Sequence, residues 1–310
     1  MAEVERMEQP DQRPQLDEHP SVPDNATFVP GRVGVLGLGL IGGSFAKALH
    51  QGGREVFAWN RTRSTLELAM IECVDGELND DTVGTCELVI LAGYPKVSIE
   101  WLEQMAQRLS PGAIVIDVVG VKRSICDACF AIAEGHAWTF VGCHPMAGTQ
   151  YSGFAHTRAN MFRNAPLVVV PPANIDDFYR LDVLERLKQL LEPCGFGSFT
   201  LSTAEHHDEV IAFTSQLAHV VSNAYVKSPS ARVHKGFSAG SYKDLTRVAR
   251  LNAQMWTELF LEDADYLSRE IGILINNLQQ YKDAIDNDDA ETLKALLAEG
   301  DRRKREIEGR

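Results

Sequence analysis

"RVGVLGLGLIGGS" (residues 32–44) is the stretch that decides the fold. A short run rich in valine leads into the spacing Gly37-x-Gly39-x-x-Gly42, and a segment with helical spacing follows. A GxGxxG spacing between a strand and a helix indicates a dinucleotide-binding turn. Gly37 permits the tight turn, Gly39 lets backbone N–H groups approach a pyrophosphate, and Gly42 lets the helix pack against the strand. A plain glycine turn is the alternative, which this context disfavours.

Strand and helix patterns alternate along the sequence on both sides of this turn. Seven strands are predicted, at residues 32–37, 54–59, 87–93, 113–120, 139–145, 165–172 and 195–202. The helical segments between them have the length of crossover helices. The fold class predicted is therefore α/β, a doubly wound Rossmann-type parallel sheet, followed by an all-helical dimerisation domain.

Only helical patterns follow residue 202. A capping box, Ser202-x-x-Glu205, opens a long helix, and Ser241-x-x-Asp244 opens another. We predict a dinucleotide-binding domain at residues 31–201 and a helical substrate and dimerisation domain at 202–310, whose charged end frays. The apolar stripes of the long helices favour a homodimer, although packing of the helices on one another is the alternative.

Composition limits the class of protein. The chain has 310 residues, 45% of them hydrophobic, and a formal net charge of −13, which argues against nucleic-acid binding. Residues 1–30 are polar, acidic and rich in proline, and we predict that they form a disordered tail. Without a membrane-length apolar run or a signal core, we expect a cytoplasmic protein with no membrane partner.

No metal site is expected. Six cysteines are scattered, and one pair, Cys126 and Cys129, has the CxxC spacing on a predicted helix without a second pair to complete a zinc site. "AEHHDE" (204–209) combines histidines and acids, but acids in the first turn of a capped helix favour the helix dipole, and we interpret the segment in that way.

The end of the second strand distinguishes the two nicotinamide cofactors. NAD sites usually have an acid there, whereas this chain has Asn60, Arg61, Arg63 and Ser64. Arginines would bind the 2′-phosphate of NADP. NADP is therefore favoured, and NAD remains possible if the arginines are merely solvated. The remaining cofactor contacts are predicted from the first helical turn and a later strand end: Leu40, Ile41 and Gly120.

"VGCHPMAGTQYSGF" (141–154) contains the candidate base. A predicted strand ends at His144, and Pro145 holds the residue before it in extended geometry. An imidazole has a pKa near neutrality and suits proton transfer, so His144 is a candidate catalytic base. A turn histidine without a role is the alternative.

Five segments in order carry a family resemblance: "VLGLGLIGGS" (35–44), "DVVGVK" (117–122), the block at 142–154, "SQLAHVVSNA" (215–224) and "DLTRVARLNAQMW" (244–256). Over residues 32–285 the chain resembles the prephenate/arogenate dehydrogenase family of tyrosine biosynthesis. The resemblance implies oxidative decarboxylation of prephenate to 4-hydroxyphenylpyruvate by an NAD(P)-dependent dehydrogenase. It implies that His144 bonds the 4-hydroxyl group, and that His219 and Arg247 anchor the dicarboxylate substrate. Further substrate contacts are predicted from Thr149, Gln150, Gln216, Gly240 and Trp256.

Three positions depart from the family pattern. Gly120 stands where the family often has a serine, so His144 must be oriented by something else, such as water. Gln150 and Gln216 replace ionisable residues near the substrate. By spacing, Lys243, Arg247 and Arg250 share one face of a predicted helix, and a solvated face suffices for the first and last.

Other functions remain open at this point. Arogenate is an alternative substrate. A β-hydroxyacid or imine reductase joins a similar pair of domains but usually relies on a lysine in the helical domain. A nicotinamide-sensing regulator would bind the cofactor without needing His144.

Overall fold

The structure, a computed structural model, describes residues 22–149 and 151–309. The predicted disordered tail lies outside these residues as far as residue 21. Its last part is not disordered, because the backbone N–H groups of Thr27 and Phe28 donate to Ser110 Oγ at 2.8 and 3.2 Å. Phe28 is buried, and the first strand begins at residue 29, directly after it.

Eight strands form one sheet in the order β3-β2-β1-β4-β5-β6-β7-β8. They are β1 (Val29–Leu36), β2 (Val56–Trp59), β3 (Gly76–Glu77), β4 (Cys86–Leu91), β5 (Ile114–Asp117), β6 (Thr139–Pro145), β7 (Pro166–Val170) and β8 (Ser198–Leu201). The first six strands have the Rossmann order, and the reversal between β1 and β4 is the switch point at which such sheets bind nucleotides. The two-residue strand β3 is too short to show a sequence pattern.

The predicted parallel, doubly wound sheet is confirmed, and within it β6 and β7 are the one pair of neighbouring described strands that runs antiparallel. A parallel return needs a crossover, usually a helix. The connection from β6 to β7 contains only the short 3₁₀ helix η3 (Phe154–His156) among its described residues, so the chain turns back alongside the strand it has left.

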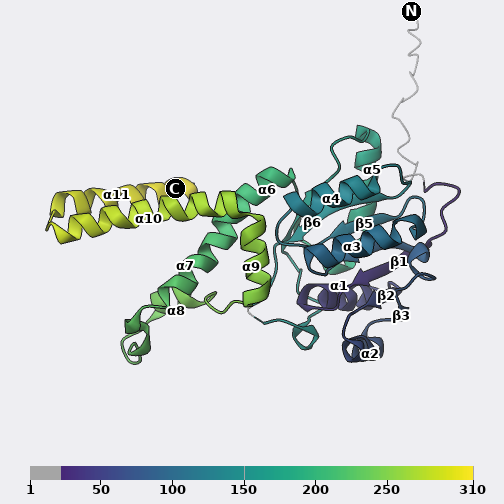
Figure 1. The fold of residues 1–310 in the computed structure, drawn as a ribbon, viewed down its shortest axis with the longest axis horizontal. Helices are drawn as coiled ribbons and strands as arrows, with labels where there is room; N and C mark the ends of the chain where they lie inside the picture. Colours follow the sequence, from purple (N-terminus) through teal and green to yellow (C-terminus); the bar gives the residue numbers. More distant parts are fainter. Residues whose placement is uncertain (1–21, 150, 310) are drawn as a thin grey trace, which may run out of the picture.

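Helices cover both faces of the sheet (Figure 1). On one face lie α1 (Leu40–Gln51), α2 (Arg63–Glu72) and α5 (Asp177–Leu190), and on the other lie α3 (Pro95–Met105) and α4 (Arg123–Ala133). All six residues of β4 are buried. Its Leu88 and Ile90 pack into the core beneath α1, α2 and α5, and its Val89 and Leu91 pack into the core beneath α3 and α4. This is expected for a strand that is covered on both sides.

The rest of the chain is helical and extends away from the sheet (Figure 1). Its elements are α6 (Ala204–Ile211), the π-helical segment η5 (Ala212–Leu217), α7 (Ala218–Tyr225), the 3₁₀ helix η6 (Pro229–Arg232), α8 (Gly240–Thr246), α9 (Ala253–Glu262), α10 (Ala264–Asp286) and α11 (Ala290–Ile307). α10 and α11 run side by side as the outermost pair.

The predicted helix starts are displaced. Thr203 rather than Ser202 caps α6, because its side chain accepts from the His206 N–H at 3.2 Å. The cap predicted at Ser241 is wrong as well, since α8 already begins at Gly240 and has no side-chain cap. The charged end of the chain does not fray before Ile307, and i,i+4 ion pairs such as Arg303–Glu299 line this last helix.

α8 also ends earlier than predicted, at Thr246. Lys243 therefore lies within the helix, Arg247 is its C-cap, and Arg250 lies beyond it, so the three cations do not share one helical face.

Within the described ranges, no helix is long and apolar enough to cross a membrane. In the same ranges no three histidine, cysteine or acidic side chains group as metal ligands would.

Candidate active site

The glycine turn lies at the carboxyl end of β1 and opens α1. Gly37 has a φ of +89°, and a Cβ there would stand 2.9 Å from the carbonyl oxygen of Ala92. A Cβ on Gly42 would stand 1.9 Å from the Gly37 carbonyl oxygen, so this position admits glycine alone. A Cβ on Gly39 would meet no described atom within 4 Å. The middle glycine therefore faces open space, as a turn that cradles a pyrophosphate requires.

α1 has no side-chain cap at its N-terminus, where Gly39 is the N-cap residue. The N–H groups of the first turn, which includes Leu40 and Ile41, are thus available to an anion, and the helix dipole favours one. The residues of this turn fit a dinucleotide phosphate.

The polar residues after β2 divide into two roles. Asn60 Oδ1 accepts from the N–H of Leu38 at 3.0 Å, so this side chain fastens the glycine turn to the end of β2. Arg63 is occupied by ion pairs with Glu77 at 2.7 Å and Glu67 at 3.3 Å. Arg61 is exposed and has no ion pair within the described part of the chain. Ser64, in the first turn of α2, is exposed as well.

His144 stands near the carboxyl end of β6, and Gly120 follows the neighbouring strand β5. A Cβ on Gly120 would lie 4.0 Å from His144 Nε2 and 3.6 Å from the side chain of Leu259 in α9. The carboxyl ends of β5 and β6 and the helix α9 thus meet around this imidazole nitrogen.

Asp117 fixes the loop that carries Gly120. Its carboxylate accepts from the N–H of Val119 at 2.9 Å and from the N–H of Cys143 at 3.1 Å, and it pairs with Lys122 Nζ. Asp117 and Lys122 are fully buried. The pair holds the loop against β6, so the relative position of Gly120 and His144 is built into the sheet edge.

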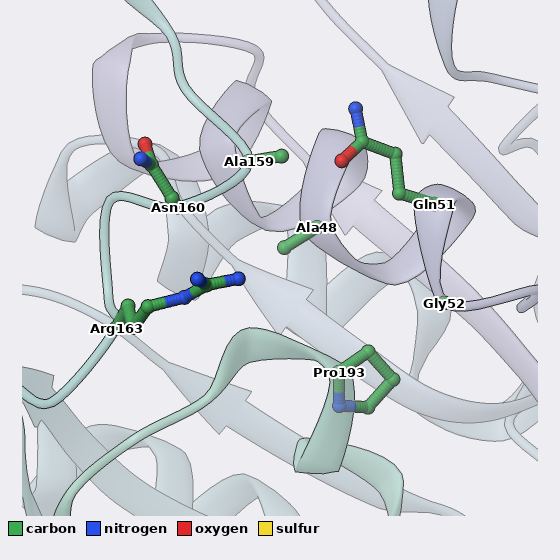
Figure 2. A pocket seen from close by; sticks show the side chains of 7 residues that line it. All are labelled: Ala48, Gln51, Gly52, Ala159, Asn160, Arg163 and Pro193. Carbon is green, nitrogen blue, oxygen red and sulfur yellow. The ribbon is translucent and has the colours of Figure 1, made fainter.

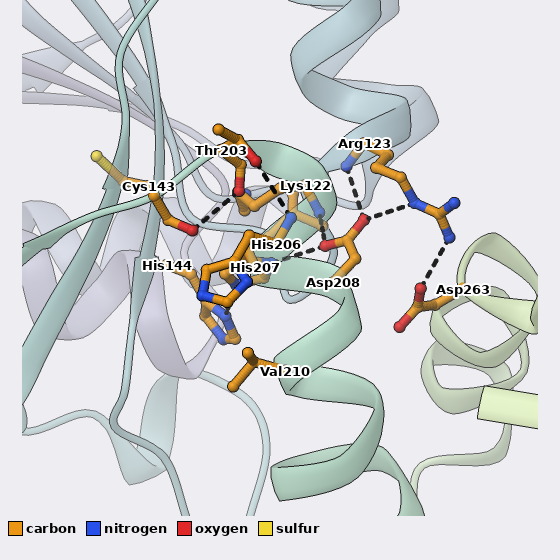
Figure 3. A network of polar contacts seen from close by, with 12 residues as sticks. Lys122, Arg123, Cys143, His144, Thr203, His206, His207, Asp208, Val210 and Asp263 are labelled. Atoms are coloured by element: carbon orange, nitrogen blue, oxygen red, sulfur yellow. Dashed lines mark hydrogen bonds and ion pairs between the residues drawn. The ribbon is translucent and has the colours of Figure 1, made fainter. Parts of the chain in front are cut away.

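A second histidine, His207 of α6, lies against the first (Figure 3). His144 Nδ1 and His207 Nε2 are 2.9 Å apart, and His207 Nδ1 lies 2.7 Å from Asp208 Oδ1. His207 is 3% exposed and Asp208 is wholly buried. The expected water is therefore not needed to orient His144, since a protein side chain does so.

Sequence reasoning missed these two residues, because it interpreted "AEHHDE" as acids that favour the dipole of a capped helix at its first turn. The signal was the spacing of Ala204, His207, Asp208 and Ile211, which is the buried stripe of α6. Asp208 does serve a helix N-terminus, but that of α4: it accepts from the N–H groups of Lys122 at 2.7 Å and Arg123 at 2.8 Å.

The surroundings shift the pKa values of His144, His207 and Asp208. Burial, followed by repulsion from His207 and Lys122, holds the pKa of His144 well below its usual range. Burial also lowers the pKa of His207, although its hydrogen bond to Asp208 opposes this. Burial alone would raise the pKa of Asp208, but hydrogen bonds from His207 and two backbone N–H groups outweigh it and lower that pKa.

Other predicted site residues gather around α9. His219 Nδ1 donates to the carbonyl oxygen of Ser215 at 2.8 Å, and among the described residues its Nε2 has no hydrogen-bond partner. Its ring packs on Trp256, with centroids 4.1 Å apart. Burial, and less strongly the positive charge of Arg247, lowers the pKa of His219. Because Leu259 lies one turn after Trp256, α9 links this group to Gly120.

The remaining predicted residues have distinct environments. Gln216 is 2% exposed, and both polar atoms of its amide lack a partner within the described residues. Thr149 is exposed, and its Oγ accepts from the N–H of Tyr151 at 3.2 Å. Gly240 is exposed at the start of α8. Gln150 lies outside the described residues.

A surface hollow lies elsewhere, between the end of α1 and the segments around residues 160 and 193 (Figure 2). Its lining includes Gln51, Asn160, Arg163 and Pro193, and none of the predicted site residues.

The comparisons with known proteins agree along the chain. The family model "Prephenate dehydrogenase, nucleotide-binding domain" matches residues 45–198, and "Prephenate dehydrogenase, dimerization domain" matches residues 203–299. The prephenate dehydrogenase of Bacillus subtilis (strain 168) is 28% identical over 268 residues, which are 83% of this chain and 71% of that protein. The glycine turn precedes the matched residues, so its role rests on its own geometry.

Two solved structures extend the likeness. A prephenate dehydrogenase from A. aeolicus, in complex with hydroxyphenyl propionate and NAD+, is 27% identical with a TM-score of 0.75, covering 89% of this chain and 98% of that one. The arogenate dehydrogenase of Synechocystis is 30% identical with a TM-score of 0.71, covering 88% of this chain and 99% of that one.

Proposed function

The chain belongs to the prephenate dehydrogenase family, and we propose that it catalyses the oxidative decarboxylation of prephenate to 4-hydroxyphenylpyruvate. The observation that carries this proposal is the position of His144, whose Nε2 faces Gly120 at the edge of the sheet that bears the glycine turn. A base at this place can act on a substrate held between the turn and α9.

The proposed chemistry needs one base and a hydride acceptor. A nicotinamide cofactor held by the glycine turn would supply the acceptor for the hydride that leaves ring carbon C4 of the substrate. His144 Nε2 takes the proton of the 4-hydroxyl group, which assists loss of the hydride. The ring then loses CO₂ and keeps the electron pair of the broken bond, and the resulting phenolate oxygen takes the proton back from His144. The lowered pKa of His144, caused mainly by burial, favours its unprotonated form, which is the form that can accept a proton.

The cofactor is held, in this proposal, by residues 31–201. Gly37, Gly39 and Gly42 form the turn, and the first turn of α1 and the Gly120 loop complete the contact. We propose that NADP is favoured over NAD, because Asn60 rather than an acid follows β2 and Arg61 is unpaired within the described residues. Arg63, whose ion pairs compete for it, contributes less.

Substitution separates the two arginines. Arg61→Ala is expected to lower kcat/KM for NADP at least about tenfold and to leave that for NAD within about twofold, as loss of one charged phosphate contact would. Arg63→Ala, the matched control, is expected to have a smaller effect. Equal rates with both cofactors in the wild type would contradict the preference for NADP.

The substrate contacts are proposed from residues 202–310 together with the loop after β6. Arg247 binds a carboxylate of the dicarboxylate substrate, since a guanidinium pairs with carboxylates in a bidentate manner. Asn223 Nδ2 donates to the carbonyl oxygen of Ala249 at 3.0 Å, which ties the arginine segment to α7. His219 Nε2 and the amide of Gln216, which has no partner among the described residues, supply further polar contacts. Thr149, Gln150, Gly240 and Trp256 complete the proposed set.

Prephenate is favoured over arogenate, because arogenate carries an ammonium group in place of the keto group. None of the proposed substrate residues is a carboxylate that would pair with it. A homodimer through the helical region is also proposed, because α10 exposes Ile275, Leu278 and Ile285 along its length.

The test follows reduced cofactor by absorbance with prephenate or arogenate, each with NADP and NAD, in the wild type and in His144→Asn. Turnover of prephenate that falls at least about a hundredfold in the variant supports the proposal, because a general base contributes that much. Turnover of arogenate alone would change the substrate. Cofactor binding without turnover of either would favour the sensing regulator.

A further inference from the structure

Two hydrogen bonds connect His144, His207 and Asp208 in series. His144 Nδ1 lies 2.9 Å from His207 Nε2, and His207 Nδ1 lies 2.7 Å from Asp208 Oδ1. His144 belongs to the sheet and the other two to α6, the first helix after it (Figure 3). This series of hydrogen bonds therefore connects the candidate base to the helical region.

Asp208 determines which atom donates in each of these hydrogen bonds. Besides His207, it accepts from the N–H groups of Lys122 and Arg123 and from Arg123 Nε at 3.3 Å. These partners are all donors, so Asp208 acts only as an acceptor and is ionised. His207 Nδ1 must therefore carry the proton of the bond that joins it to Asp208.

The tautomer of each histidine follows from that end. A neutral His207 that is protonated on Nδ1 has a lone pair on Nε2. His144 Nδ1 must then donate to it, and the lone pair of His144 remains on Nε2. This is the nitrogen that faces Gly120, 4.0 Å from where a Cβ would stand.

We propose that His207 and Asp208 are positioning residues that hold His144 in the tautomer whose Nε2 is the base. The inference deepens the proposed function and rests on it for the identity of the proton donor. When His144 Nε2 takes the proton of the substrate hydroxyl, the imidazolium keeps its Nδ1 proton in the bond to His207, and the carboxylate of Asp208 stabilises the positive charge through that ring. The proton returns from Nε2 to the phenolate oxygen after CO₂ leaves, so no proton is lost from the three residues.

A purely structural role is a weaker account of the same contacts. Thr203 already caps α6 and Asp208 already serves the N-terminus of α4, and neither function needs an imidazole at residue 207. His207 is nevertheless buried with a partner on each ring nitrogen. The charged groups facing the two rings are Asp208, Lys122 and Asp117.

The first test measures tautomers directly by two-bond ¹H–¹⁵N NMR correlation of the imidazole rings at about pH 7.5, without substrate. Signals are assigned with His144→Asn and His207→Gln. Both His144 and His207 are expected to be neutral and protonated on Nδ1. A proton on Nε2 of His144, or a charged His144, overturns the inference.

The second test compares two substitutions of His207. Glutamine can still accept from His144 Nδ1 through its amide oxygen, whereas leucine cannot. His207→Leu is expected to lower kcat with prephenate about 10²–10³-fold and to change KM less than about threefold, and His207→Gln is expected to recover about tenfold of that loss. Equal kcat in the two variants overturns the inference.

His206→Gln is the matched control, since His206 is the adjacent residue on the exposed side of α6. It is expected to keep wild-type kcat and KM. The two proposals can fail separately. If the enzyme shows the predicted tautomers but turns over neither prephenate nor arogenate, the proposed function is contradicted and the positioning role of His207 and Asp208 is supported. Turnover of prephenate with His144 protonated on Nε2 would do the reverse.

Discussion

Arg123 Nη2 lies 2.9 Å from Asp263 Oδ1, and this contact joins the start of α4 to the residue before α10. The same guanidinium reaches Asp208 of α6 at 3.3 Å and Asp265 of α10. Asp208 and Asp263 are wholly buried, while Arg123 keeps about a quarter of its side chain exposed, at 26%. One side chain of the sheet region therefore neutralises carboxylates from two helices of the other region.

Replacement of Arg123 by alanine is expected to lower the free energy of unfolding by about 1–3 kcal/mol, because it leaves buried carboxylates without a cation, although solvent moderates the loss. The measurement is denaturant unfolding at neutral pH. Arg269→Ala is the matched control, since Arg269 is about half exposed and pairs with Glu209, which is equally exposed, and with Glu270. An equal loss in the two variants would contradict a special role for Arg123.

Asp263 should make stability depend on pH. Burial and repulsion from Asp208 raise its pKa to about 6, against the opposing effect of Arg123, from an ordinary value of 3.8. The folded chain thus holds this proton more tightly than the unfolded chain, and the stability it contributes is lost as the pH rises through about 6. Asp263→Asn removes the effect, so the variant should lose less stability than the wild type, by about 1–3 kcal/mol, between about pH 4.5 and about pH 7.5.

Unfolding by denaturant at those two pH values measures the difference. Asp265, whose pKa Arg123 lowers to about 2, acts in the opposite direction, but its contribution is lost only in more acidic solution. It is also present in both proteins and cancels in the comparison. If both lost the same stability over this range, the raised pKa of Asp263 would be refuted.

The glycine turn offers a matched pair of substitutions. Gly42→Ala places a Cβ 1.9 Å from the Gly37 carbonyl oxygen and is expected to destabilise the fold by about 1–3 kcal/mol or more. Gly39→Ala meets no described atom, and its φ of −71° suits alanine, so unfolding should be unchanged. Its methyl group enters the space left for a pyrophosphate, and KM for the cofactor should rise at least about tenfold. Steady-state kinetics that show an unchanged KM for Gly39→Ala would argue against the cradle.

Local chemistry made part of this molecule predictable from the sequence. The turn from Gly37 to Gly42 was predicted because the spacing of its glycines, the strand pattern before them and the helical pattern after them all lie within one short stretch. His144 was placed at a strand end because Pro145 and the preceding apolar run act on the same short segment. Strand direction is different: nothing in the residues of β7 records that it runs against β6, and only the missing crossover helix shows it.

Long-range partners explain the rest. His207 and His144 are 63 positions apart, and the pattern of α6 shows only that His207 is on its buried side. Arg63 was considered for a phosphate because it is an arginine after the second strand, and its ion pair with Glu77, 14 positions on, was not predicted because β3 brings the two together. In each case the sequence gives the character of a side chain, while its neighbour is set by tertiary packing.

The outer side of α10 carries the last prediction. Ile275, Leu278 and Ile285 are 58%, 59% and 61% exposed, and their spacing of three and seven puts them on one side of the helix. α10 contacts η5 and α11, and Ala284 is buried, so the helix is already partly covered by its own chain.

If the three apolar side chains meet a second copy, Leu278→Asp buries an unpaired carboxylate at that contact, which costs several kcal/mol. The wild type should then sediment as a dimer at micromolar concentration and the variant as a monomer with unchanged helix content. Leu181→Asp, at a 65% exposed position on α5, is the control and should remain dimeric. A wild-type monomer, or a dimer that tolerates the aspartate, would remove α10 from the interface.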